Sequence, residues 1–149
     1  MTIGELCARH RRIAIDANVL IYLLEDTPSL ADVSQAVLDA AEDGRVSAVL
    51  ASVGLAEICV GPARRGDLAL VERYAEVLSS MPGLRIQPAT ARIAVDAAVI
   101  RGVRGIGLAD ALHLASARVA RATAFVTNDR RVRGSTRLEV VYLDELAVA

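Results

Sequence analysis

The sequence predicts a single α/β domain of three layers, in which helices cover both faces of a mainly parallel central sheet. Short β-branched runs alternate with segments of helical period along the chain, which is typical of parallel α/β folds. A length of 149 residues is that of one domain. No repeat, low-complexity segment or Pro/Gly/Ser-rich linker marks a boundary, so we expect residues 1–149 to form one unit.

Each expected element has a local signal. Arg12–Asp16 is expected to form the first strand, with the helix Ala17–Leu24 directly after it. The next helix is expected to begin at Pro28-Ser29, where Ser29 and Asp32 form a capping pattern, and to end at Gly44. The later elements are the strand Val46–Leu50, the helix Ser52–Val60 ending near Gly61-Pro62, the helix Asp67–Ser79, the strand Leu84–Gln87, the helices Ala91–Arg101 and Leu108–Val119, and the strands Ala122–Thr127 and Glu139–Leu143.

Composition excludes several classes of protein. With 54% hydrophobic and 23% charged residues, the chain is not intrinsically disordered. Its longest run without a charge, Val46 to Ala56, has eleven residues, too few for a transmembrane helix, which needs about 20. Arg9-His10-Arg11-Arg12 before an apolar stretch resembles a signal peptide, but Asp16 interrupts that stretch and no cleavage pattern follows.

The cysteines, the net charge and the mean hydropathy indicate the protein's compartment and its partners. Cys7 and Cys59 have neither metal-like spacing nor a disulfide framework, which favours a reduced, cytoplasmic protein. All 17 basic residues are arginine, and a net charge of −1 argues against coating nucleic acid by bulk electrostatics while allowing a local basic site. The mean hydropathy of +0.40 is high, so we expect a second copy or another chain to cover part of the apolar surface.

Four acidic residues are expected at one edge of the sheet, where the carboxyl ends of the strands form the ligand sites of open parallel sheets. They are Asp16 closing the first strand, Glu57 in the helix after the second, Asp110 in the first turn of the last long helix, and Asp129 just after the strand ending at Thr127. Each has a purely structural alternative: a helix cap, a solvated helix position, a partner of the helix dipole or a turn residue. Asp16 and Glu57 lie in strongly apolar segments, where an unpaired carboxylate is costly, and this favours a common site.

A cluster of four carboxylates suggests bound divalent cations. Two like charges 4 Å apart repel by about 4 kcal/mol at an effective dielectric constant of 20, so the acids must be protonated in part or share a cation. Oxygen ligands without a Cys/His set indicate Mg²⁺ or Mn²⁺ and not zinc. Such a site suits phosphodiester hydrolysis, because the ion activates water and stabilises the leaving oxygen.

Other polar residues near the acids are candidates for supporting roles. Thr127 and Asn128 come directly before Asp129, and His113 lies one helical turn after Asp110, although the sequence favours a buried structural histidine there. Several arginines follow Asp129, and guanidinium groups bind phosphate in a bidentate manner. The alternative interpretation of these arginines is a solvated loop without a binding role. The candidate phosphate-binding residues are Arg130, Arg131 and Arg133.

The ordered motifs resemble the PIN domain family, and within it the VapC toxins of bacterial toxin–antitoxin pairs. The matching segments are Asp16-Ala17-Asn18-Val19-Leu20-Ile21-Tyr22, Ala51-Ser52-Val53-Gly54-Leu55-Ala56-Glu57, Leu108-Ala109-Asp110-Ala111-Leu112-His113-Leu114-Ala115 and Val126-Thr127-Asn128-Asp129. They occur in the family's order over nearly the whole chain. No single segment is specific, but the set of four is.

The resemblance implies a metal-dependent endoribonuclease that cuts structured cellular RNA, often tRNA or ribosomal RNA. Asp16, Glu57 and Asp110 would ligate Mg²⁺ or Mn²⁺, and Asp129 would be the fourth acid, nearer a second metal or acting through water. The resemblance also implies a homodimer, inhibited by a VapB-type antitoxin whose C-terminal segment lies over the active site. Thr127 falls where the family often has a hydroxyl group.

Alternatives of other classes differ in their expected signals. A PIN-like nuclease of RNA maturation or DNA processing would act without an antitoxin, and a non-catalytic PIN-fold interaction module would bind no Mn²⁺. A phosphatase with an aspartyl nucleophile is excluded, because Asn18 stands where its second aspartate is needed and the chain has no lysine. A dinucleotide-binding domain is the remaining fold alternative, and the lack of a Gly-x-Gly-x-x-Gly motif after the first strand argues against it.

Overall fold

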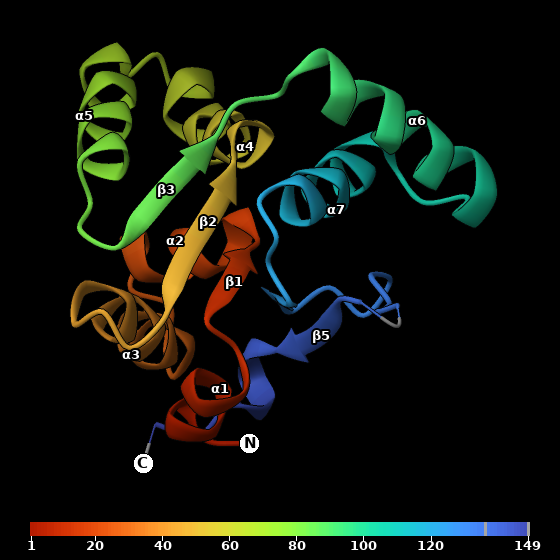
Figure 1. Cartoon of the computed structure of the whole chain (residues 1–149). Helices are drawn as coiled ribbons and strands as arrows, with labels where there is room; N and C mark the ends of the chain where they lie inside the picture. Colours follow the sequence, from red (N-terminus) through yellow and green to blue (C-terminus); the bar gives the residue numbers. More distant parts are fainter. Residues whose placement is uncertain (136, 149) are drawn as a thin grey trace.

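The central sheet has five strands, and all the pairs described are parallel. The computed structural model describes residues 1–135 and 137–148, and Figure 1 shows the sheet with helices on both sides. Its spatial order is β3-β2-β1-β4-β5. The three-layer prediction is therefore confirmed. The strands are β1 (Arg12–Ile15), β2 (Ser47–Ala51), β3 (Leu84–Gln87), β4 (Ala124–Thr127) and β5 (Glu139–Tyr142).

The helices connect these strands and cover both faces of the sheet. Seven α-helices and one short 3₁₀ segment (Leu143–Glu145) lie within the described residues. None of these helices combines the length and apolar character needed to cross a bilayer. The α-helices are α1 (Ile3–Arg9), α2 (Ala17–Leu24), α3 (Leu30–Glu42), α4 (Ser52–Arg64), α5 (Leu68–Ser79), α6 (Ala91–Arg104) and α7 (Leu108–Val119).

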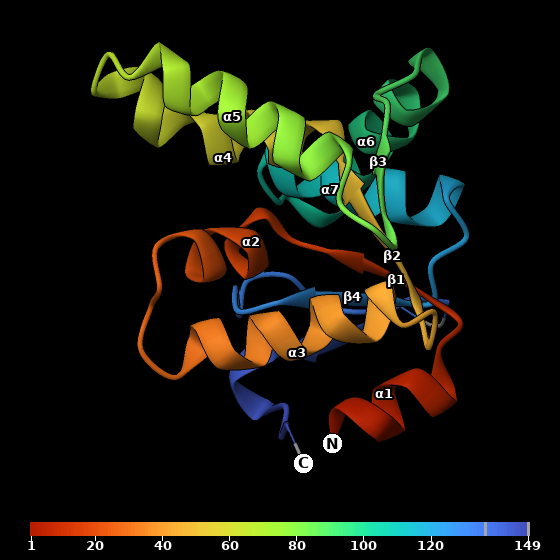
Figure 2. The ribbon, with the colours of Figure 1, turned by 90° about the vertical axis from the view of Figure 1, so that its left-hand side faces the viewer.

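The two faces of the sheet are buried by different helices, as the period of two along a strand requires. Ile13 and Ile15 of β1 belong to a core shared with α1, α2 and α3. Ala14 between them, and Phe125 of β4, belong to a second core shared with α6 and α7. Figure 2 shows α2 and α3 on one side of the strands and α6 and α7 on the other. Strands buried on both faces explain the continuous apolar runs in the sequence.

Several local expectations differ from the structure. The helix α1 was not expected, although Thr2 and Glu5 form a capping box at its start. Ser29 precedes α3 but makes no capping hydrogen bond, because its φ of 65° is far from the extended backbone of an N-cap residue. The helix α4 continues through Pro62 to Arg64, since a proline near the end of a helix removes only one backbone hydrogen bond. The helix α6 also extends three residues further than expected.

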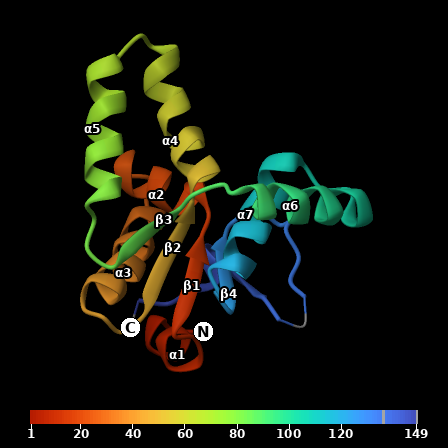
Figure 3. The ribbon, with the colours of Figure 1, turned by 45° about the horizontal axis from the view of Figure 1, so that its top comes forward.

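The strand order changes direction at β1 and β4, and open parallel sheets form a crevice at the carboxyl ends of such strands. The chain leaves β1 towards β2 on one side, and β4 returns on the other side of β1. Ile15 pairs with Val126, and the Asp16 N–H donates to the Val126 carbonyl at 2.9 Å. Ligand sites of open parallel sheets lie at such switch points. Helices α4 and α5 extend beyond the sheet at this end (Figure 3).

Candidate metal and catalytic site

Asp16 lies at the carboxyl end of β1 and points into the crevice. It holds the N-cap position of α2, yet its side chain makes no capping hydrogen bond. Its Oδ2 accepts a hydrogen bond from the Thr127 hydroxyl at 2.6 Å, and its Oδ1 lies 3.6 Å from Nε2 of His113. Asp16 is only 6% exposed. The capping alternative for this residue is therefore wrong, because the carboxylate faces the site.

Thr127 links the ends of two strands through one hydroxyl group. The hydroxyl donates to Asp16 Oδ2 and accepts from the backbone N–H of Asp129 at 3.0 Å. The side chain is fully buried. Thr127 therefore fixes the carboxylate that follows β1 and the start of the loop that carries the fourth acid.

We expect Thr127→Val to destabilise the fold by about 1–3 kcal/mol, because both hydrogen-bonding partners of the buried hydroxyl lose it. Urea unfolding in EDTA measures this change. Thr127→Ser keeps the hydroxyl and is the matched control, expected to retain most of the stability. Equal stability of the valine and serine variants would contradict the role of this hydroxyl.

Glu57 and His113 form a short contact between α4 and α7. Nε2 of His113 lies 2.6 Å from Oε1 of Glu57. The imidazole is 2% exposed, and Nδ1 has no hydrogen-bonding partner among the described residues. A proton on Nδ1 would thus be a buried, unsatisfied donor, so we infer that Nε2 carries the proton and donates to Glu57. The histidine is buried, as the sequence suggested, but it faces the acids.

Asp16, Glu57 and His113 make the tightest group of potential ligand atoms. One atom from each lies within 4.8 Å of the other two, in the part of the chain that the structure describes. With His113 Nε2 protonated, the ligands that remain are carboxylate oxygens, which suit Mg²⁺ or Mn²⁺. The Glu57 side chain is 40% exposed and opens the group to solvent. The donor set therefore fits a divalent cation.

Asp110 and Asp129 adjoin this group without belonging to it. Burial, followed by the charges of Asp129 and Asp16, raises the pKa of Asp110. Hydrogen bonds from Arg131 lower the pKa of Asp129. The structure thus brings all four predicted acids to one edge of the sheet, but in two different electrostatic environments.

The opposite pKa shifts predict opposite effects on stability at pH 7. A raised pKa means that folding favours protonated Asp110, so its ionisation costs stability as pH rises from 3.8 through the raised pKa. A lowered pKa means that ionised Asp129 stabilises the fold above pH 3.8. This contribution is lost as pH falls through the lowered pKa. In EDTA at pH 7, we expect Asp110→Asn to raise the free energy of unfolding and Asp129→Asn to lower it. Urea titrations measure both, and a shift of both variants in the same direction would contradict the assignment.

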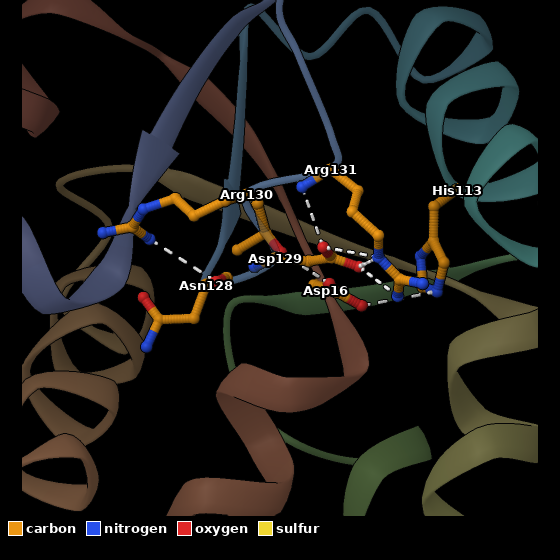
Figure 4. A network of polar contacts seen from close by, with 7 residues as sticks. Asp16, His113, Asn128, Asp129, Arg130 and Arg131 are labelled. Atoms are coloured by element: carbon orange, nitrogen blue, oxygen red, sulfur yellow. Dashed lines mark hydrogen bonds and ion pairs between the residues drawn. The ribbon is translucent and has the colours of Figure 1, made fainter. Parts of the chain in front are cut away.

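The predicted phosphate-binding arginines separate into different environments. Arg131 contacts Asp129, at the site. Arg130 donates to Asp144 at 2.7 Å and stacks over the Tyr142 ring at 3.9 Å. Figure 4 shows Arg130 and Asn128 on the side of the network away from His113. Arg133 accepts, through its carbonyl, a hydrogen bond from the side chain of Arg104.

Two of the residues predicted at the site, Asn128 and Arg130, also make structural contacts. Asn128 Oδ1 accepts from the Asp144 backbone N–H at 3.0 Å, and Arg130 holds the same segment through its carboxylate contact. Together they attach the loop after β4 to the turn after β5. Asn128 and Arg130 thus stabilise the C-terminal segment, and their supporting and phosphate-binding roles stay predictions. Their contacts span 14 and 16 positions, which no local motif reveals.

The comparisons with known proteins concern the family and the fold. No curated protein gives a significant match. Many solved structures share the fold, and three of them are compared below. VapBC2 from Rickettsia felis, bound to a promoter DNA fragment, is 18% identical, with 88% of this chain and 98% of that chain covered and a TM-score of 0.69. FitAB bound to an IR36 DNA fragment is 25% identical, with 91% and 97% covered and a TM-score of 0.68. VapC20 from Mycobacterium tuberculosis, a sarcin–ricin loop cleaving toxin, is 16% identical, with 76% and 86% covered and a TM-score of 0.58.

The family assignment follows from a match over most of the chain. The family model described as PIN domain matches residues 13–135, which include β4, all of β1 except Arg12, and all four acids. The resemblance inferred from the sequence motifs is thereby confirmed. The chain belongs to the PIN domain family, and its fold is that of VapC-type toxins.

Proposed function

We propose that this PIN domain is a divalent-metal-dependent endoribonuclease and the toxin of a toxin–antitoxin pair. The observation that carries the proposal is the meeting of Asp16, Glu57, Asp110 and Asp129 at the carboxyl edge of the sheet, with His113 buried between Asp16 and Glu57. Four carboxylates in one crevice do not stabilise the fold by themselves, because without a cation their mutual repulsion destabilises it. A phosphodiester hydrolase gains from this arrangement.

Asp16 and Glu57 would hold Mg²⁺ or Mn²⁺, with Asp110 and Asp129 beside them. When bound, the ion would polarise the phosphoryl group and stabilise the leaving oxygen. Thr127 fixes one oxygen of Asp16, and His113 fixes one oxygen of Glu57, so both carboxylates are oriented before substrate binds. Burial, followed by the charges of Asp129 and Asp16, raises the pKa of Asp110, and a cation bound beside this carboxylate would offset that repulsion, which suits the ligand role that the resemblance implies.

The substrate we propose is structured RNA, such as tRNA or ribosomal RNA. VapC20, whose fold this chain shares, is described as cleaving the sarcin–ricin loop. A net charge of −1 provides little non-specific attraction to nucleic acid, which suits an enzyme that selects particular sites. Arg131 and Arg133 lie on the loop after the fourth acid and would contact substrate phosphates.

An antitoxin of the VapB type is the partner we propose. Two of the structures that share the fold are toxin–antitoxin assemblies bound to DNA. A hollow of about 130 Å³ opens beside Glu57, between α2, α4 and α5, and would accept apolar side chains of an antitoxin segment. It is lined by Ile21, Leu24, Glu25, Glu57, Ile58, Gly61, Pro62, Arg65 and Tyr74. A segment docked there would also cover the proposed metal site.

A homodimer is the assembly we propose. Exposed valines recur every four residues along α6, at Val95, Val99 and Val103. This spacing makes an apolar stripe on one helical face, the surface that a second copy would cover. Light scattering is expected to give twice the monomer mass for the wild type, and Val99→Asp is expected to give the monomer. A monomeric wild type would contradict the dimer.

Incubation of the purified protein with total cellular RNA and Mn²⁺ tests the proposed activity. Matched lanes contain EDTA or the Asp110→Asn variant. We expect discrete fragments in the wild-type lane alone, and mapping of their ends would identify the substrate. Equal cleavage in all lanes would show a contaminating nuclease, and no cleavage together with no calorimetric binding of Mn²⁺ would favour a binding module without activity.

A further inference from the structure

Asp129 is neutralised by an arginine of its own loop. The Arg131 backbone N–H and Nε donate to Asp129 Oδ1 at 2.9 and 3.0 Å. Its Nε and Nη2 also lie 3.1 and 2.7 Å from Oδ2. The guanidinium thus binds both carboxylate oxygens, the geometry that gives arginine–carboxylate pairs their strength. Figure 4 shows this pair beside Asp16.

The pair is built into the end of β4. The Asp129 N–H is held by the Thr127 hydroxyl at 3.0 Å, and its carbonyl accepts from the Val132 N–H at 3.1 Å. The backbone therefore fixes the Asp129 carboxylate, which is 16% exposed, while the Arg131 side chain lies over it and is 83% exposed. Arg131 covers the solvent side of Asp129, from which a second cation would approach.

Arg131 also serves as a counter-charge for the neighbouring acid. The hydrogen bonds to Asp129, followed by the charges of Asp129 and Asp110, raise the pKa of Arg131, and Arg131 in turn partly offsets the rise in the pKa of Asp110. Asp16 and Glu57 make up the compact ligand group with His113, and Asp129 lies outside it. Within the described residues, Asp16 and Glu57 thus share one potential cation position, and Asp129 is paired with one guanidinium.

We propose that Arg131 takes the place of a second divalent cation at Asp129, so that this PIN domain binds a single ion, at Asp16 and Glu57. The inference rests on the proposed nuclease function and concerns which cations neutralise the acids of the same site. A guanidinium is a monovalent cation with five N–H donors, and two of its nitrogens are committed to Asp129. Its other N–H groups face solvent, where they can donate to a phosphate. Arg131 is thereby a positioning residue that sets the ion count.

Titration of the full chain with Mn²⁺ tests this inference, with calorimetry for stoichiometry and electron paramagnetic resonance for the count of bound ions. We expect one Mn²⁺ per wild-type chain. Arg131→Ala frees Asp129 and is expected to bind two, with an affinity for the second ion raised about 10- to 100-fold. Arg131→Lys keeps a cation and is expected to bind one. In the double variant Arg131→Ala/Asp129→Asn the second ion should be lost again.

Arg133→Ala is the matched control, because it removes an arginine of the same loop and is expected to leave the count at one. Two ions on the wild type, or one ion on Arg131→Ala, would overturn the inference while leaving the proposed nuclease function intact. No binding of Mn²⁺ by any chain would overturn both. Arg131 is exposed, so the alanine variant is expected to fold, and thermal unfolding in EDTA verifies this.

Discussion

Asp16→Asn is expected to lower the rate of RNA cleavage by at least about 100-fold, because loss of a proposed ligand should exceed the 10- to 100-fold cost of losing a residue behind it. Asparagine offers one neutral oxygen where aspartate offers a charged carboxylate. That oxygen can still accept the hydrogen bond of Thr127, which now lies 2.6 Å from Asp16 Oδ2. The variant should therefore lose cation affinity and keep the strand end in place.

The same variant separates a catalytic carboxylate from a structural one. Asp16 lies among acids that repel it, so removing its charge in EDTA should leave the free energy of unfolding unchanged or raised. Fragment yield from RNA, Mn²⁺ binding and urea unfolding should be measured together. Asp43→Asn is the control, since this aspartate caps the end of α3 and its side chain is 64% exposed. Full activity of Asp16→Asn would contradict the proposed site, and loss of activity with loss of folding would make Asp16 structural.

The sequence predicts the scaffold well where periodicity is strong. The strand Leu84–Gln87 and the helices Ala17–Leu24 and Leu108–Val119 have the expected bounds, because apolar positions with a period of two or 3.6 specify which face is buried. The helix α1 shows the limit of this reasoning. It has seven residues, too few for a clear period, and the capping pair Thr2 and Glu5 was its one local signal.

Positions of the acids were predictable from topology, but the contacts of their side chains were not. An acid after β1 and another after β4 must approach each other in a parallel sheet, and the structure brings Asp16 and Asp129 to the same crevice. The contact of His113 with Glu57 spans 56 positions and depends on how α4 packs against α7. The pairing of Arg130 with Asp144 likewise depends on tertiary structure. Sequence spacing specifies the edge of the sheet, and packing decides which side chains face it.

Gly54 shows how closely that packing controls the site. A Cβ at this position of α4 would lie 2.6 Å from Cδ1 of Leu50 and 2.9 Å from Cε1 of His113. Both neighbours are buried, at 0% and 2% exposed, so neither side chain has free space to enter. We expect Gly54→Ala to destabilise the fold by about 1–3 kcal/mol, the usual cost of overpacking a core. It should also weaken Mn²⁺ binding, because His113 must move away from Glu57.

Gly4→Ala in α1 is the control for Gly54→Ala. The nearest atom to a Cβ there is Thr2 Oγ1 at 3.7 Å, an ordinary van der Waals contact. Alanine is favoured over glycine within a helix by about 0.5–1 kcal/mol, so Gly4→Ala is not expected to lower the free energy of unfolding. Urea unfolding and Mn²⁺ titration of the two variants compare close packing with helix propensity. If Gly54→Ala were as stable as Gly4→Ala and bound Mn²⁺ equally well, α4 would not hold His113 against Glu57. A loss of stability and of Mn²⁺ affinity in Gly54→Ala alone would show that a residue without a side chain helps to position the proposed metal site.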